Sequence, residues 1–186
     1  MKINRIILGV FFTLALWSCK NDKTAETPAA AAETPAPIPN DVLVFTLRAT
    51  VQKDDSFQLY YKEDADPAVQ FSEEKSIYAE IRGSSEPQDI VFQLPKDVMP
   101  QGIRFDFGFN KNQSEIVVES FTMTLNDKKF ESKGADFFNY FMANMNTVKL
   151  DWNKGIVTPI KSPDGSYDPM FDTGKPLMDQ INKLFM

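Results

Sequence analysis

The chain contains no histidine among its 186 residues. Without an imidazole it cannot build a Ser-His-Asp or Cys-His catalytic group, and it cannot offer a histidine ligand to zinc. It also lacks a glycine-rich phosphate-binding loop. The enzymatic chemistry that remains is a pair of carboxylates acting as acid and base. Nearly all of the candidate carboxylates stand in polar turns, with Asp106 as the exception. A solvated carboxylate is the simpler interpretation of such a turn, so we predict that the protein is not an enzyme.

Cysteine is almost absent too: the only one is Cys19, in the stretch LALWSCKND. Lys2 and Arg5 give the N-terminus a positive charge, and residues 6–16 form an apolar run shorter than the ~20 residues of a membrane span. A charged start, an apolar run, a small residue and a cysteine follow one another in the order of an export signal. We therefore predict a signal peptide at residues 1–18.

The sequence LWSC resembles the lipobox of bacterial lipoproteins, in which an apolar residue and two spacers, the second of them small, precede the cysteine. The resemblance implies that Cys19 carries acyl chains such as palmitate and becomes the first residue of the mature protein. Such chains anchor a protein stably, so we expect a membrane-anchored protein of the cell envelope. Lys20 stands where inner-membrane retention signals place aspartate, which favours the outer membrane and leaves its two faces open. The alternatives are an ordinary secretory signal and an uncleaved anchor.

Residues 20–40 are rich in alanine and proline and contain one large apolar side chain, Ile38. Such a segment cannot bury enough surface to offset the entropy of ordering it, so we predict a lipidated, disordered tether over residues 19–41. The remaining residues, 42–186, have the usual size of one domain. Loss of the signal peptide removes two of the 20 basic residues and none of the 26 acidic ones, so the charge becomes 18 − 26 = −8. This charge argues against nucleic acid as a partner.

Apolar and polar residues alternate in six runs of the domain, at residues 43–51, 57–61, 77–83, 89–95, 103–110 and 117–125. The alternation assigns Phe109 and Val117 to the interior, and it assigns Gln58 and Tyr60 to the outside. Short runs of period two that are separated by turn sequences such as GSSEP are typical of an antiparallel sandwich. We predict an all-β fold, with a single antiparallel β-sandwich.

Two stretches depart from this alternation. Residues 135–145, ADFFNYFMANM, contain too many bulky apolar groups for a surface loop, and they predict a short helix or a plug that closes one end of the sandwich. Residues 176–185 have apolar side chains at helical spacing, with Pro176 in a position that suits a first turn. We expect a C-terminal helix there that packs back on the domain.

Several features of residues 45–171 come in a characteristic order: a strand with the sequence IRFD at residues 103–106, a strand at residues 115–122 and the sequence DPMF at residues 168–171. This order resembles a carbohydrate-binding-module-like β-sandwich, of jelly-roll or galactose-binding type, found as an accessory domain beside bacterial envelope glycosyltransferases. The resemblance implies a sandwich fold and a role in binding glycans.

Outward-facing residues of the predicted strands supply the candidate ligand site, because tyrosine offers a flat ring for stacking and arginine, glutamate and aspartate hydrogen-bond to hydroxyls. The candidates are Arg48, Tyr60, Tyr78, Glu80, Arg82, Arg104 and Asp106. Arg104 and Asp106 are two residues apart on one strand, so we expect them to pair. We hypothesise a lipid-anchored module that binds an envelope saccharide. The alternative is a non-catalytic assembly lipoprotein that binds another envelope protein.

No cofactor is expected. The oxygen-rich turns EDADP at residues 63–67 and SPDGSYDP at residues 162–169 could offer carboxylates and carbonyls to a structural Ca²⁺ ion. Neither turn has the spacing of an EF-hand, and a solvated turn is the simpler interpretation of both. Calcium therefore stays open as an alternative.

Overall fold

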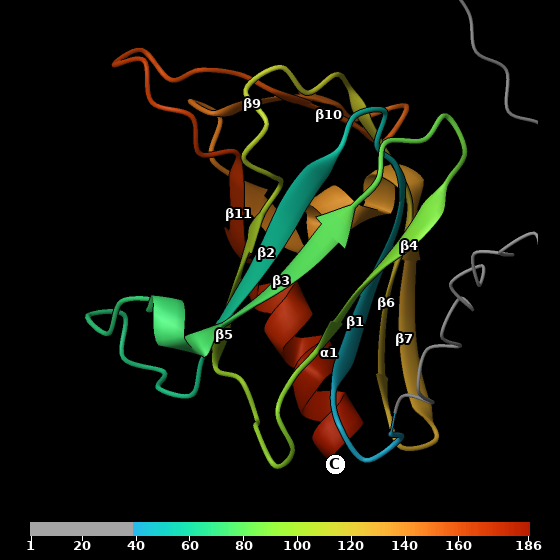
Figure 1. Cartoon of the computed structure of the whole chain (residues 1–186). Helices are drawn as coiled ribbons and strands as arrows, with labels where there is room; N and C mark the ends of the chain where they lie inside the picture. Colours follow the sequence, from blue (N-terminus) through green and yellow to red (C-terminus); the bar gives the residue numbers. More distant parts are fainter. Residues whose placement is uncertain (1–38) are drawn as a thin grey trace, which may run out of the picture. The chain divides into compact units, whose positions relative to one another are not determined.

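The computed structural model describes residues 39–186, which fold into two antiparallel β-sheets packed face to face (Figure 1). The six-stranded sheet has the order β4–β1–β6–β10–β9, with β7 also paired to β6. Its strands are β1 (Val44–Thr50), β4 (Gln88–Gln93), β6 (Ile116–Leu125), β7 (Lys128–Lys133), β9 (Val148–Asp151) and β10 (Ile156–Pro159).

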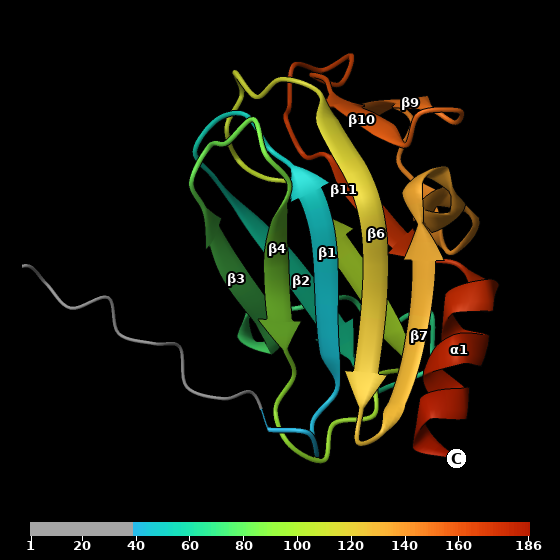
Figure 2. The same cartoon turned by 90° about the vertical axis from the view of Figure 1, so that its right-hand side faces the viewer.

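The five-stranded sheet has the order β3–β2–β5–β11–β8. Its strands are β2 (Asp55–Lys62), β3 (Ser76–Ile81), β5 (Gly102–Asp106), β8 (Phe141–Ala143) and β11 (Met170–Thr173). Figure 2 shows β4, β1, β6 and β7 in one layer with β2 and β3 behind them. The predicted all-β sandwich is confirmed.

Phenylalanine fills the space between the sheets. Eight phenylalanine side chains are fully buried: Phe45, Phe57, Phe92, Phe105, Phe107, Phe121, Phe137 and Phe171. Many of these rings meet edge to face, as do Phe92 and Phe105, whose centroids are 5.0 Å apart at an interplanar angle of 89°. Burial of one such ring contributes ~1.5–3 kcal/mol, so this interior is the main source of stability.

A β-bulge in β6 explains why Val117, contrary to what the alternation of the sequence predicts, does not face the interior. Arg48 lies opposite Ser120 while the next residue, Ala49, lies opposite Val118, so Glu119 is an extra residue on β6. The extra residue reverses the alternation along the strand. Val118 is buried and Val117 is only half-buried, so the assignment of Val117 to the interior was wrong.

Of the two predicted departures from the strand pattern, the first forms a 3₁₀ helix and a short strand, and the second forms an α-helix. A 3₁₀ helix, η2 (Gly134–Asn139), buries Phe137 and Phe138, and β8 follows it directly. The C-terminal helix α1 (Lys175–Phe185) carries Pro176 in its first turn. It buries the side chains of Leu177, Ile181 and Leu184. Because α1 packs against β6 and β7, it covers a side of the sandwich that would otherwise expose apolar surface (Figure 2).

The predicted signal peptide, Cys19 and the tether up to residue 38 lie outside the described residues. Within residues 39–186, no helix is both long and apolar enough to cross a membrane.

Candidate binding face

Most of the sequence-predicted ligand residues meet on the outer face, by which we mean the solvent side of the five-stranded sheet. Tyr60 on β2 pairs with Arg104 on β5, and Gln58 pairs both with Tyr78 on β3 and with Asp106 on β5. Directly opposed residues of antiparallel strands share a face, so these side chains form a row across β3, β2 and β5. Glu80 extends the row on β3, where its carboxylate accepts a hydrogen bond from the Ser56 hydroxyl at 2.9 Å.

The structure separates the other two predicted residues from this row. Arg48 belongs to β1, in the other sheet, where its guanidinium lies 3.0 Å from Asp89 and 3.6 Å from Glu119. Arg82 is exposed and lies beyond the last residue of β3. The placement of Arg48 on the same face as Tyr60 was wrong because the chain crosses from one sheet to the other between β1 and β2.

The carboxylate of Glu73 is hydrogen-bonded to three side chains of the outer face. It accepts hydrogen bonds from the Gln58 amide at 3.0 Å, from the Tyr60 hydroxyl at 2.8 Å and from the Tyr78 hydroxyl. These bonds, those of the two tyrosines first, lower the pKa of Glu73. Burial, with the neighbouring Glu73 carboxylate, raises the pKa of Tyr60 well above its usual value.

Glu73 lies in a segment that we call the strap, residues 63–75, which joins β2 to β3 and includes the 3₁₀ helix η1 (Glu73–Lys75). Gln58 stands on the outward side of β2 as predicted, but its contact with the strap leaves it only 1% exposed. Sequence reasoning missed Glu73 because it lies outside every alternating run.

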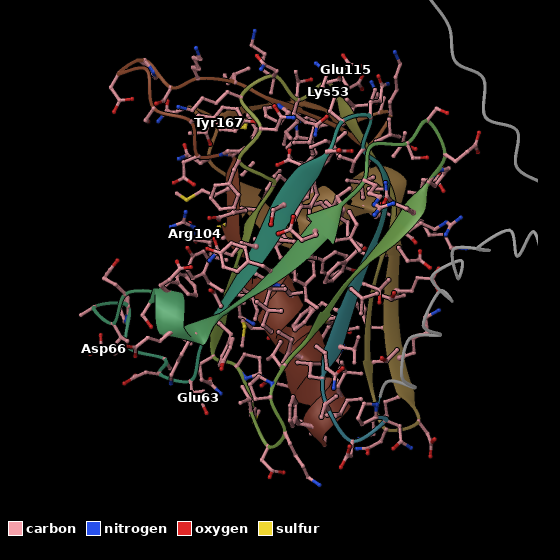
Figure 3. The ribbon with its side chains drawn as sticks, viewed as in Figure 1. Lys53, Glu63, Asp66, Arg104, Glu115 and Tyr167 are labelled. Carbon is pink, nitrogen blue, oxygen red and sulfur yellow. The ribbon has the colours of Figure 1, made fainter. Side chains whose placement is uncertain are left out.

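The expected pair of Arg104 and Asp106 is confirmed, and Arg104 also pairs with a second carboxylate, that of Asp168. The Nε and Nη2 atoms of Arg104 donate to the two oxygens of Asp106 at 2.7 and 2.8 Å, and Nη2 also donates to Asp168 at 2.9 Å. The guanidinium lies over the Tyr60 ring, 5.2 Å from its centroid. Figure 3 places Arg104 beside β2, on the outer side of the sheet. Burial raises the pKa of Asp106 to about 6, against the lowering effect of Arg104.

Two exposed aromatic rings lie together at the β3 end of the row. Tyr78 is 50% exposed and Phe109 53% exposed, and their ring centroids are 6.1 Å apart. The alternation of β5 assigned Phe109 to the interior, which was wrong. The strand ends at Asp106, and Gly108 follows with a φ of 96°, so the chain leaves the strand geometry before it reaches Phe109.

The buried carboxylate of Asp55 holds this turn in place. Its Oδ1 atom accepts the backbone N–H groups of Phe109 at 2.8 Å and Asn110 at 3.0 Å, and Oδ2 accepts the Gln113 amide at 2.9 Å. The exposed Phe109 ring therefore stands on a fixed backbone. A rigid pair of exposed rings is a preorganised platform for stacking.

A cleft of about 540 Å³ continues the outer face past the other end of the row. Its apolar walls include Phe71 from the strap, Met142 from β8 and Met178 from α1. Lys62 also lines the cleft, where its ammonium donates to two backbone carbonyls of the strap, each at 3.1 Å. Asp172 supplies a carboxylate there.

The two oxygen-rich turns use their carboxylates within the chain. Asp64 and Asp66 each accept a backbone N–H two residues further on, at 2.8 Å, and Glu63 pairs with Lys75 at 2.7 Å. In the other turn, Asp164 accepts the backbone N–H of Ser166 at 2.9 Å. Among residues 39–186, no three acidic side chains come together as a metal-binding group.

Comparisons with protein-family models, with curated proteins and with solved structures give no significant match to the chain.

Proposed function

We propose that the protein is a lipid-anchored, non-catalytic module of the cell envelope whose outer face binds a saccharide. The observation that carries this proposal is the pair formed by Tyr78 and Phe109, two half-exposed rings held side by side. A sugar ring presents apolar C–H groups that pack on aromatic faces, and its hydroxyls pair with planar polar groups. Glu73 supplies such a group next to the platform, and Arg104 and Asp168 supply further ones along the outer face.

The chemistry of the row favours binding over catalysis. Asp106 is the most deeply buried carboxylate of the row, 4% exposed, and both of its oxygens accept hydrogen bonds from Arg104. A carboxylate that is buried and ion-paired in this way is hardly accessible to a substrate. The lipid anchor of the proposal rests on the lipobox-like sequence that ends at Cys19.

The test is retention of the purified domain on a panel of cell-envelope polysaccharides in affinity electrophoresis. Replacing both Tyr78 and Phe109 with alanine removes the platform and should abolish retention without changing the circular dichroism spectrum. Trp152→Ala is the matched control, because Trp152 is an equally exposed aromatic (55%) at the β9–β10 turn, away from the outer face. If no polysaccharide retains the wild-type domain, the saccharide proposal fails.

The second candidate is a module that binds another envelope protein. Trp152 and Met145 favour it, because both are more than half exposed and both residue types are enriched in the cores of protein interfaces. In that case Trp152→Ala, and not the double variant of Tyr78 and Phe109, should reduce the yield of a cross-linked complex in envelope preparations.

A further inference from the structure

We propose that the outer face selects uncharged saccharides and rejects those that carry carboxylate or phosphate groups, because Asp168 masks the cation of Arg104. This inference rests on the proposed saccharide-binding function and adds the chemical class of the ligand. It also makes Asp168 a residue that determines specificity.

The positive charge of Arg104 is already paired with carboxylates of the protein. An arginine on a binding surface is the usual partner for an anionic ligand, because its fork of N–H groups fits a carboxylate or a phosphate. Here the Nε and Nη2 atoms already serve Asp106 and Asp168. One cation that is shared by two carboxylates offers no net positive charge at the place where an anion would otherwise bind.

The neighbouring groups increase this excess. Glu73 and Glu80 stand on the β3 side of Arg104. On the other side, Asp172 pairs with Arg104 across β5 and β11, and its side chain has no hydrogen bond or ion pair with any residue of the described chain. An anionic group on a ligand that reached Arg104 would meet the carboxylates of Asp168 and Asp172 there, and like charges placed together cost enough to exclude a partner.

Lys62 does not reverse this balance. It stands at the far end of β2, in the cleft, where its ammonium already donates to the carbonyls of Asp66 and Val69 and lies 5.6 Å from the centroid of the Phe71 ring. Its charge is therefore engaged by the strap and is displaced from the aromatic platform.

The dimensions of the row favour an oligosaccharide over a single sugar. From the platform on β3 to Asp172 on β11 the row crosses three gaps between neighbouring strands, at ~4.8 Å each, or about 14 Å in all. Such a ligand would stack on Tyr78 and Phe109 at one end and donate its hydroxyls to the more exposed carboxylates of Asp168 and Asp172 at the other. Uncharged hydroxyls are the groups that a surface rich in acceptors can bind without repulsion.

The experiment uses a neutral polysaccharide that retains the wild-type domain and the same polymer after carboxymethylation. Carboxymethylation should weaken retention of the wild type by roughly fivefold or more at low salt, and added salt should reduce the difference. Asp168→Asn keeps the shape of the side chain and frees the cation of Arg104, so it should raise retention on the carboxymethylated polymer relative to the neutral one. Asp127→Asn changes the net charge by the same amount at the β6–β7 turn and should leave that ratio unchanged.

Three results would overturn the inference or part of it. Equal or stronger retention on the carboxymethylated polymer by the wild type overturns the inference and leaves the saccharide-binding function standing. An unchanged ratio in Asp168→Asn overturns the role of Asp168. Should that variant fail to fold, Asp172→Asn must raise the ratio instead, since Asp172 lies beside Arg104 in the sheet. If no polysaccharide retains the wild type, the proposed function and this inference fall together.

Discussion

At the scale of single residues, Asp55 holds the backbone from which the ring of Phe109 projects. Its carboxylate accepts two consecutive backbone N–H groups and one side-chain amide from the segment that follows β5. A carboxylate that receives several N–H donors is a strong local restraint, because loss of any one leaves a polar group without a partner in a part-buried site. One aspartate thus holds the backbone beneath an exposed ring that is distant from it in the sequence.

A side chain at Gly108 would disturb the turn that Asp55 holds. The φ of Gly108, 96°, lies in the region that L side chains rarely adopt, and a Cβ atom there would stand 2.4 Å from an oxygen of Asp55. Gly108→Ala should therefore lower the free energy of unfolding by ~2–4 kcal/mol, measured by urea denaturation. Gly165→Ala is the control, because Gly165 has a φ of 85° and open space around it, so it should lose only the ~1 kcal/mol of backbone strain. Equal losses in both variants would show that the Asp55 contact is unimportant.

Asp106 gives the stability of the domain a pH dependence. Burial raises its pKa to about 6 in the folded protein, whereas an unfolded aspartate titrates near ~3.9. Between these values the folded state keeps a proton that the unfolded state has released, so the contribution of Asp106 to stability falls as the pH rises from ~4 to ~6. The fall is on the order of 2–3 kcal/mol for a shift of this size.

The variant Asp106→Asn removes this titration. Asparagine cannot ionise, so residue 106 should leave the stability of the variant level over the pH range in which that of the wild type falls. The difference in unfolding free energy between wild type and variant should therefore shrink as the pH rises through this window, in chemical denaturation series at matched ionic strength. Two parallel pH profiles would contradict the raised pKa.

At the scale of elements, the strap is attached to the sheet at two places, through Glu73 and through the bonds that Lys62 donates to its backbone carbonyls. Glu73→Ala would remove the acceptor of Gln58, Tyr60 and Tyr78 together, so we expect residues 63–75 to exchange their amide hydrogens faster while the core strands keep their protection. Glu74→Ala is the matched control from the same turn of η1 and should leave exchange in the strap unchanged. Unchanged exchange in Glu73→Ala would mean that the strap is held by other contacts.

The long strands could be predicted from the sequence because their alternation depends only on neighbouring residues. The six runs correspond to β1 through β6, and their shared period placed Tyr60, Tyr78, Arg104 and Asp106 on outward positions correctly. Strands β8 to β11 have only three or four residues each, which is too short for alternation to be recognised.

Other parts of the fold and the site depend on contacts between distant segments, and these leave no local pattern. Membership of a sheet is one: Arg48 has the same alternation as Tyr60, yet its strand pairs with β4 and β6. The bulge at Glu119 and the turn at Gly108 are others, since each reverses or ends an alternation that otherwise continues. Asp168 joined the site only because β11 pairs with β5.

At the scale of the whole molecule, the predicted lipid anchor decides where the binding face would operate. Cys19→Ser removes the thiol that the acyl chains require, so the variant should leave the membrane fraction or accumulate as an uncleaved precursor of higher mass. Fractionation and intact-mass measurement check this. Ser18→Ala keeps a small residue before the cysteine and should be processed like the wild type. A Cys19→Ser protein that fractionates and migrates like the wild type would contradict the anchor.

The position of β1 has a mechanical consequence. This strand follows directly after residues 39–43, where Asn40 accepts a hydrogen bond from Asn126, and it lies between β4 and β6 in the six-stranded sheet. A force applied to the N-terminal segment along the strand would load the ladders on both of its sides at the same time, in shear, and could not peel them apart one bond after another. The sandwich should therefore withstand a greater pull from this end than from Met186, where the force would first unwind the last turn of α1.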